Sequence, residues 1–193
     1  MQNKKVKIFY PKNIASWRKW LEKNHSAEQA VWVVFHSKSS GLKTIAWTEA
    51  VDVALCFGWI DSKKISIDQE TTQQYFSKRK PNSTWSKINK AKVERLIEQG
   101  LMEEAGYASI EVAKQNGSWT MIDDVEELII PDDLSKAFGN NKGAKKYFLS
   151  LSKSKQKYLL QWIVLARQPQ TRQKRIDEIA SCAAKQKMPN HLQ

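Results

Sequence analysis

The sequence predicts an α+β fold: an N-terminal antiparallel or mixed sheet with helices on one face, followed by a helical C-terminal region. Runs rich in β-branched and aromatic residues alternate with helical patterns up to Lys78, in the order strand, helix, strand, helix, hairpin. Beyond Pro131 the apolar residues recur at helical spacing. We therefore predict an α+β module over residues 1–122 and a helical region over residues 123–193.

The N-terminal elements have recognisable starts and stops. Asn13 is a good helix cap, and Gly58 has the backbone freedom needed to end a helix. The run Ala30–Lys38 is apolar on both sides, so we expect a strand that is covered on both faces. The predicted elements are a strand over Val6–Tyr10, a helix from Asn13 to His25, a strand over Ala30–Lys38, a helix from Thr48 to Gly58, and hairpin strands over Lys64–Asp68 and Gln74–Lys78.

The later elements are all predicted to be helices. They are a helix with the stripe Val93, Leu96, Ile97 and Leu101, a helix over Glu103–Gln115, a short helix with Tyr147, Phe148 and Leu151, a buried helix over YLLQWIVLA capped by Ser152 or Ser154, and a last helix with Ile176, Ile179, Ala180 and Ala183. Thr171 is expected to cap the last helix. Because a cation such as Arg172 opposes the dipole at a helix start, it needs an anionic partner. We expect the acidic segment Asp123–Glu127 to supply this partner, with an external phosphate as the alternative.

The charge balance favours anionic partners. The chain has 32 Lys or Arg residues against 20 Asp or Glu residues, a formal net charge of +12. Such a field attracts phosphorylated ligands, acidic proteins and nucleic acids. The charge is uneven: Lys142–Lys187 holds twelve basic and two acidic residues, whereas Glu98–Asp133 holds ten acidic residues and one Lys. The basic C-terminal helices therefore carry the nucleic-acid hypothesis, although no nucleic-acid reading motif accompanies them.

The sequence lacks the common templates of catalytic and metal sites. No HExxH, CxxC, GxSxG, GxGxxG or Walker loop occurs. Cys56 and Cys182 each lie in an apolar helical pattern, which favours reduced and inert thiols over a disulfide. We expect no metal and no cofactor. Because the N-terminal segment has no continuous apolar run and no stretch of eighteen apolar residues occurs, we expect a cytoplasmic protein.

Three stretches of the chain resemble a known family. They are ALCFGWIDS at Ala54–Ser62, YFSKRKPNSTWSKINKAKVERLIEQGLM at Tyr75–Met102 and QWIVLARQPQTRQKRIDEI at Gln161–Ile179. In this order they resemble the bacteriocin-protection (YdeI/OmpD-associated) family over nearly the whole chain. The resemblance implies an α+β module of the frataxin-like YjbR/CyaY-like superfamily followed by a helical region, and it implies no established molecular activity. Iron binding of the frataxin kind would need an acidic surface, whereas the helical faces here are mainly basic.

The segment Ser77–Lys92 crowds Lys and Arg around a predicted helix start. There the free backbone N–H groups and the helix dipole favour an anion. The predicted ligand-binding residues of this segment are Arg79, Lys80, Ser83, Ser86 and Lys87. The alternative is a plain capped helix with solvated lysines. The leading hypothesis is therefore non-catalytic binding of an anionic small ligand or an acidic partner at this helix start.

Two tryptophans and one aspartate complete the predicted site. Trp59 and Asp61 follow a helix end directly, and Asp61 is expected near Arg79, either as a structural ion pair or as part of the site. Trp85 lies inside the cationic segment and is either a core anchor or a wall of the site. A further hypothesis is an enzyme that uses Asp61 or His36 as its base.

Overall fold

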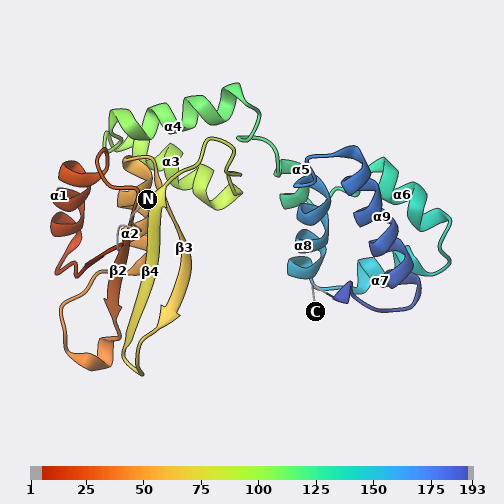
Figure 1. The fold of residues 1–193 in the computed structure, drawn as a ribbon, viewed down its shortest axis with the longest axis horizontal. Coiled ribbons are helices and arrows are strands. Elements are labelled where there is room, and N and C mark those ends of the chain that lie inside the picture. The colour runs from red at the N-terminus through yellow and green to blue at the C-terminus, as the bar shows by residue number, and fades with distance from the viewer. Residues whose placement is uncertain (1–5, 191–193) are drawn as a thin grey trace, which may run out of the picture. The chain divides into compact units, whose positions relative to one another are not determined.

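A computed structural model describes residues 6–190, which form two compact units (Figure 1). The first unit comprises the chain up to Ser83 together with Ile88–Trp119, and the second comprises Thr84–Lys87 and the chain from Thr120 onward. The second unit therefore includes a tetrapeptide that the sequence places between two stretches of the first.

The first unit is built on a four-stranded mixed sheet, as predicted. Its strands are β1 (Lys7–Phe9), β2 (Ala30–His36), β3 (Trp59–Ser66) and β4 (Thr71–Lys78), in the spatial order β1-β2-β4-β3. β1 runs parallel to β2, whereas β2 and β4, and β3 and β4, pair antiparallel. The hairpin strands are longer than predicted, and β3 already includes Trp59 and Asp61. The register between β3 and β4 shifts between Asp61 and Lys64, which marks a β-bulge.

The first unit also contains helices that accompany the sheet. They are α1 (Ile14–Asn24), α2 (Trp47–Cys56), α3 (Lys87–Glu98, from Ile88 onward in this unit) and α4 (Glu104–Gln115), with a short 3₁₀ turn, η1, at Lys38–Ser40. Asn13 caps α1 as predicted, and its side chain accepts a hydrogen bond from the Ser16 N–H at 2.8 Å. In Figure 1, α2 lies behind the sheet. The fully buried Trp17 of α1 packs edge-on against Phe76 of β4 and donates its indole N–H to the Ala50 carbonyl of α2.

The second face of β2 is less covered than the sequence suggested. On this face Val34 is buried, but Trp32 and His36 are only half-buried. The ring of Trp32 packs edge-on against Tyr75 of β4, with centroids 5.0 Å apart. Aromatic pairing within the sheet therefore supplies part of the cover that was expected on this face.

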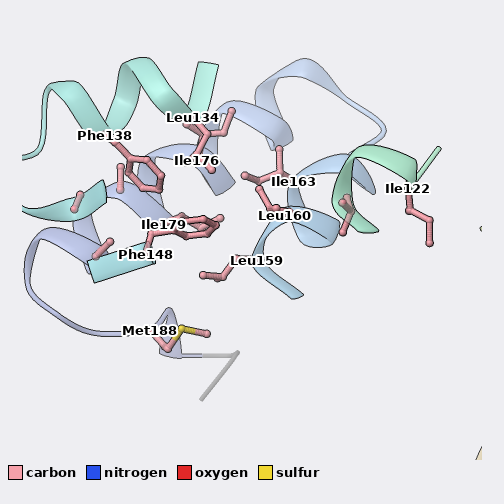
Figure 2. Close-up of a cluster of buried hydrophobic side chains, with 14 residues drawn as sticks. Ile122, Leu134, Phe138, Phe148, Leu159, Leu160, Ile163, Ile176, Ile179 and Met188 are labelled. Carbon is pink, nitrogen blue, oxygen red and sulfur yellow. The ribbon is translucent and has the colours of Figure 1, made fainter. Parts of the chain in front are cut away.

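The second unit is a group of helices around one apolar cluster. The helices are α5 (Asp123–Glu126), α6 (Asp132–Gly139), α7 (Ala144–Ser150), α8 (Lys153–Val164) and α9 (Pro169–Ala184). Figure 2 shows the cluster, in which Phe138, Phe148, Leu160 and Ile179 of four different helices lie together. Ser152 caps α8, as one of the two predicted alternatives. The helix α9 begins at Pro169, so the expectation that Thr171 caps it is wrong; proline fits the first helical turn because no partner for its missing N–H is needed there.

The predicted partner of Arg172 is also wrong. Arg172 donates from Nε to Asp133 Oδ2 at 2.8 Å and from Nη2 to Asp133 Oδ1 at 3.1 Å, and not to the segment Asp123–Glu127. Burial by itself raises the pKa of Asp133, but the hydrogen bond and charge of Arg172 outweigh it and hold that pKa below its usual value. This bidentate pair ties α6 to α9. A neighbouring cation, Arg175, lies over the ring of Trp162 at 5.1 Å.

Candidate functional site

The two tryptophans of the predicted site belong to the core. Trp59 and Trp85 are each 1% exposed. Trp59 packs edge-on against Trp20 and donates its indole N–H to the His25 carbonyl at 3.4 Å. Trp85 belongs to the second unit. Neither ring is open to a ligand, which favours the core-anchor alternative for Trp85.

Lys87, the first residue of α3, is surrounded by carboxylates of the chain itself. Its Nζ lies 2.7 Å from Glu127 Oε1, and its backbone N–H donates to Glu126 Oε1 at 3.4 Å. The hydrogen bond to Glu127 raises the pKa of Lys87, and the same contact lowers the pKa of Glu127. An internal anion thus stands where the sequence suggested an external one. The pair is exposed, so it contributes little to stability.

The eight predicted residues are distributed over both units. Arg79, Lys80 and Ser83 belong to the first unit, as do Trp59 and Asp61, whereas Trp85, Ser86 and Lys87 belong to the second. Within the first unit, Arg79 and Lys80 line one small cavity, and Asp61 lines another, larger one. The charge of Asp61 still acts on Arg79, where it opposes the lowering of the arginine pKa by burial.

The larger cavity, which we call the sheet pocket, lies in the first unit and has a volume of about 780 Å³. It is formed by residues of β2, β3 and β4, by the connection after β2 and by the start of α2. Its lining residues are Phe35, His36, Lys38, Thr44, Ile45, Ala46, Trp47, Asp61, Ser62, Lys64, Thr72 and Gln74. Phe35 and Thr72 are register partners on neighbouring strands, so the sheet itself forms one wall.

A hydrogen-bond network at Asp61 organises the sheet pocket. Asp61 Oδ2 accepts from the indole N–H of Trp47 at 2.9 Å and from the amide of Gln74 at 2.8 Å. Gln74, which is buried, also donates to the Ser62 carbonyl at 3.1 Å. Trp47 is 51% exposed, and the hydrogen bond to Asp61 holds its indole ring in one orientation. The site thus has a preformed aromatic wall.

The charges of the sheet pocket are unequal. Asp61 already accepts two hydrogen bonds, whereas neither Lys38 nor Lys64 takes part in an ion pair within residues 6–190. His36 also lines the pocket, and its Nδ1 lies 3.4 Å from the Thr71 hydroxyl. The two ammonium groups that line the pocket outnumber its one carboxylate, so the rim favours an anionic guest.

Sequence reasoning located part of this pocket and missed the rest. It singled out Asp61 and His36, which the fold brings to the same cavity. It missed Trp47, Gln74, Lys38 and Lys64. Gln74 carried a usable signal, because a glutamine in a strand opposite Val33 is a buried polar group that needs partners. The contribution of Trp47 depends on where α2 starts, which is one residue before the predicted Thr48.

Metal chemistry finds no support in the side-chain geometry. Among residues 6–190, no group of three or more His, Cys, Asp or Glu side chains is placed to hold a metal ion. Cys56 is buried, and this burial raises the pKa of its thiol. None of the helices within these residues is both long and apolar enough to cross a membrane.

Comparison with known families places both parts of the chain. Residues 9–109 match the family model described as a domain of unknown function (DUF8412), which covers more than half of the chain. Residues 127–186 match the family described as bacteriocin-protection, YdeI or OmpD-associated, in agreement with the resemblance found in the sequence. Neither the curated proteins nor the solved structures include a significant match.

Proposed function

The chain belongs to the DUF8412 family, and from that premise we propose that its first unit binds an anionic small molecule with an apolar ring in the sheet pocket. The anionic class of ligand is the one expected from the sequence, but the site is moved from the start of α3 to the sheet. The observation that carries the proposal is the exposed Trp47 ring, held by Asp61 beside two lysines.

The size of the sheet pocket suits a small organic ligand. Its volume of about 780 Å³ lies within the range of roughly 300–1,000 Å³ typical of small-molecule sites. Phe35, Ile45 and Trp47 supply apolar and aromatic surface, while Thr44, Thr72 and Ser62 supply hydroxyl groups at the edges. A mostly apolar lining with a few polar groups is the usual composition of such sites.

The lysines give the pocket its preference for negative charge. Lys64 lies just past the β-bulge of β3, where the strand changes register, and Lys38 lies in η1. A hydrogen bond to a charged group contributes more than one between neutral groups, by roughly a factor of two. We therefore expect a carboxylate or sulfonate on the ligand to face these ammonium groups and its ring to lie against Trp47.

Calorimetric titration with 2-naphthoate tests the proposal, with the neutral 2-naphthamide as the matched ligand. We expect the naphthoate to bind about tenfold more tightly than the amide. Lys64→Ala should remove most of this difference. Lys63→Ala is the control, because Lys63 is the exposed neighbour on the same strand and does not line the pocket. Equal affinities for the two ligands, or equal effects of the two substitutions, would refute the proposal.

A second candidate is acid–base catalysis in the same pocket. The observation that favours it is that Asp61 and His36, the two bases singled out from the sequence, both line one cavity. In that case a bound substrate would be turned over, and His36→Gln and Asp61→Asn would each abolish turnover while leaving 2-naphthoate binding measurable. Retention of turnover by both variants would exclude this candidate.

The α+β architecture also supports a proposed relationship to the YjbR/CyaY-like superfamily. The first unit has the mixed sheet and the accompanying helices that the resemblance implied, followed by a helical region. An experimental structure of the first unit that superimposes poorly on that superfamily would overturn this relationship.

A further inference from the structure

One end of the second unit carries a set of lysines, which we call the lysine end. Each of these lysines is exposed, and none takes part in an ion pair within residues 6–190. They are Lys142, Lys145 and Lys146 around the start of α7, Lys153 and Lys155 at the start of α8, and Lys185 and Lys187 after α9. Figure 1 shows these three segments at the same end of the unit.

Packing inside the unit holds the three segments together. The helix α7 packs against α9. Gln156 of α8 is buried and donates to the Leu151 carbonyl at 2.8 Å, which ties the start of α8 to the end of α7. The Lys187 N–H donates to the Cys182 carbonyl at 3.0 Å, so the chain after α9 stays against that helix. The cations of the lysine end therefore stand on a backbone whose shape is already fixed.

The acidic residues of the second unit lie away from the lysine end. No Asp or Glu occurs between Asp133 and Asp177 or after Glu178. Asp133 pairs with Arg172 in the first turn of α9, and the rise of the helix puts Lys185 about 20 Å further along. Asp177 and Glu178 precede Lys185 by about two helical turns, or roughly 10 Å. Since this is about the screening length at physiological salt, they neutralise the lysine end only weakly.

The start of α8 shows that this charge is not compensated within the unit. Lys153 and Lys155 lie in the first turn of α8, which has no acidic residue, and cations there oppose the helix dipole. Arg172 stands in the same position at the start of α9, where the chain supplies Asp133 as its partner. For the two lysines, residues 6–190 supply no carboxylate partner. An external anion would offset both the dipole and the repulsion among the lysines.

The spacing of the lysines selects the kind of anion. The helix α7 is about 10 Å long, so one small anion cannot reach the cations at both of its ends. A nucleic acid can, because a duplex carries one negative charge per roughly 1.7 Å of its axis. A membrane-surface helix needs a broad apolar face, whereas the large apolar side chains exposed between Ala144 and Ala184 are Leu149, Tyr158 and Leu165.

The side chains also indicate how such a partner is held. Lysine is a point charge on a flexible stem and lacks the planar fork with which arginine reads a base edge. Contacts from lysine to phosphate position a nucleic acid but carry no sequence information. We infer that the lysine end binds the phosphate backbone of a nucleic acid without preference for sequence.

Two charge-matched triple variants test this inference. One changes three lysines of the lysine end: Lys145→Gln, Lys146→Gln and Lys153→Gln. The other changes three exposed lysines of the first unit: Lys12→Gln, Lys19→Gln and Lys63→Gln. Fluorescence anisotropy of the full chain with a labelled DNA duplex of about 20 base pairs gives the affinity at a series of salt concentrations. Each phosphate contact contributes about −0.9 to the slope of log affinity against log salt, so the lysine-end variant should make the slope shallower by about 3 and the control by less than about 1.

Further measurements separate the possible outcomes. Two duplexes of unrelated sequence should bind equally well. Thermal unfolding and 2-naphthoate binding should be unchanged in both variants, so this surface and the sheet pocket are tested independently. An equal change of slope in the two variants would mean that only net charge acts, and it would overturn the inference. A clear preference for one duplex, or no duplex binding at low salt, would overturn it as well. So would binding to phosphatidylserine vesicles that is as tight as duplex binding and is weakened in the lysine-end variant, since the surface would then belong to a membrane.

Discussion

Replacing Gly106 by alanine should destabilise the first unit, although alanine is the better helix former. Gly106 lies inside α4, where glycine costs about 1 kcal/mol relative to alanine. A Cβ at this position would lie 2.3 Å from the Cys56 carbonyl oxygen and 2.9 Å from the Cys56 carbonyl carbon. These are backbone atoms at the end of α2, so a side-chain rotation cannot relieve the contact.

The magnitude follows from three effects. Overpacking of this kind typically costs about 1–3 kcal/mol, and a backbone clash belongs at the upper end. The Cys56 carbonyl also accepts the Glu103 N–H at 3.1 Å, a bond of about 1 kcal/mol that the displaced carbonyl would weaken. The helix-propensity gain offsets about 1 kcal/mol. We therefore expect the free energy of unfolding of the first unit to fall by about 2–3 kcal/mol, or a decrease in Tm of roughly 10 °C.

Calorimetric unfolding measures this effect, with Gly139→Ala as the control. Gly139 lies at the end of α6 in the second unit, and a Cβ there would meet no atom within 4 Å. We expect this substitution to be neutral or to raise the stability of the second unit by up to about 1 kcal/mol. If Gly106→Ala were as stable as the parent protein, the close approach of α4 to the end of α2 would be wrong.

Two other substitution experiments follow from the ionisable groups. Asp133→Asn should lower the stability of the second unit by about 1 kcal/mol at pH 7, a value discounted for the partial exposure of the pair. The folded pKa of Asp133 is depressed, so this stabilisation is complete above the unfolded pKa of 3.8 and is lost as the pH falls through the lower folded pKa. Urea unfolding of the parent and of Asp133→Asn at pH 7 and pH 3 measures the effect, with Asp124→Asn as the control. A stability difference between parent and variant that is the same at both pH values would contradict it. In the folded protein, a thiol reagent at pH 8 should modify the half-buried Cys182 faster than Cys56, because Cys56 is buried and its raised pKa disfavours the thiolate. The fast phase of the reaction should be absent in Cys182→Ser. A fast phase that persists in this variant would contradict the assignment.

The sequence was sufficient for local structure and insufficient for partners. Asn13 and Ser152 were recognised as caps because capping depends on neighbouring residues. The partner of Arg172 was misplaced, since two acidic segments precede it and only the packing of α6 on α9 selects Asp133. The start of α2 was misplaced by one residue and the cap of α9 by three, because helix ends are the least well specified parts of a helix.

The candidate site shows the same limit. Asp61, His36, Arg79 and Lys80 were chosen by residue type, and each of them does line a cavity. Their grouping was different from the expected one, because proximity along the chain was taken for proximity in space. Trp59 and Trp85 show the error that this assumption causes, because both rings are buried in the interior. Register shifts such as the bulge at Asp61/Lys64, which decide where a strand residue points, leave no mark in composition.

The interleaved order of the two units restricts how this chain can be divided. Thr84–Lys87 counts with the second unit yet falls inside the stretch matched by the first family. A gene fragment that encodes residues 120–193 would therefore lack Trp85, which belongs to the second unit. A fragment that ends at residue 119 would contain Trp85 but lack the rest of the second unit. Recombination between relatives is conservative only when the tetrapeptide and the C-terminal helices are inherited together.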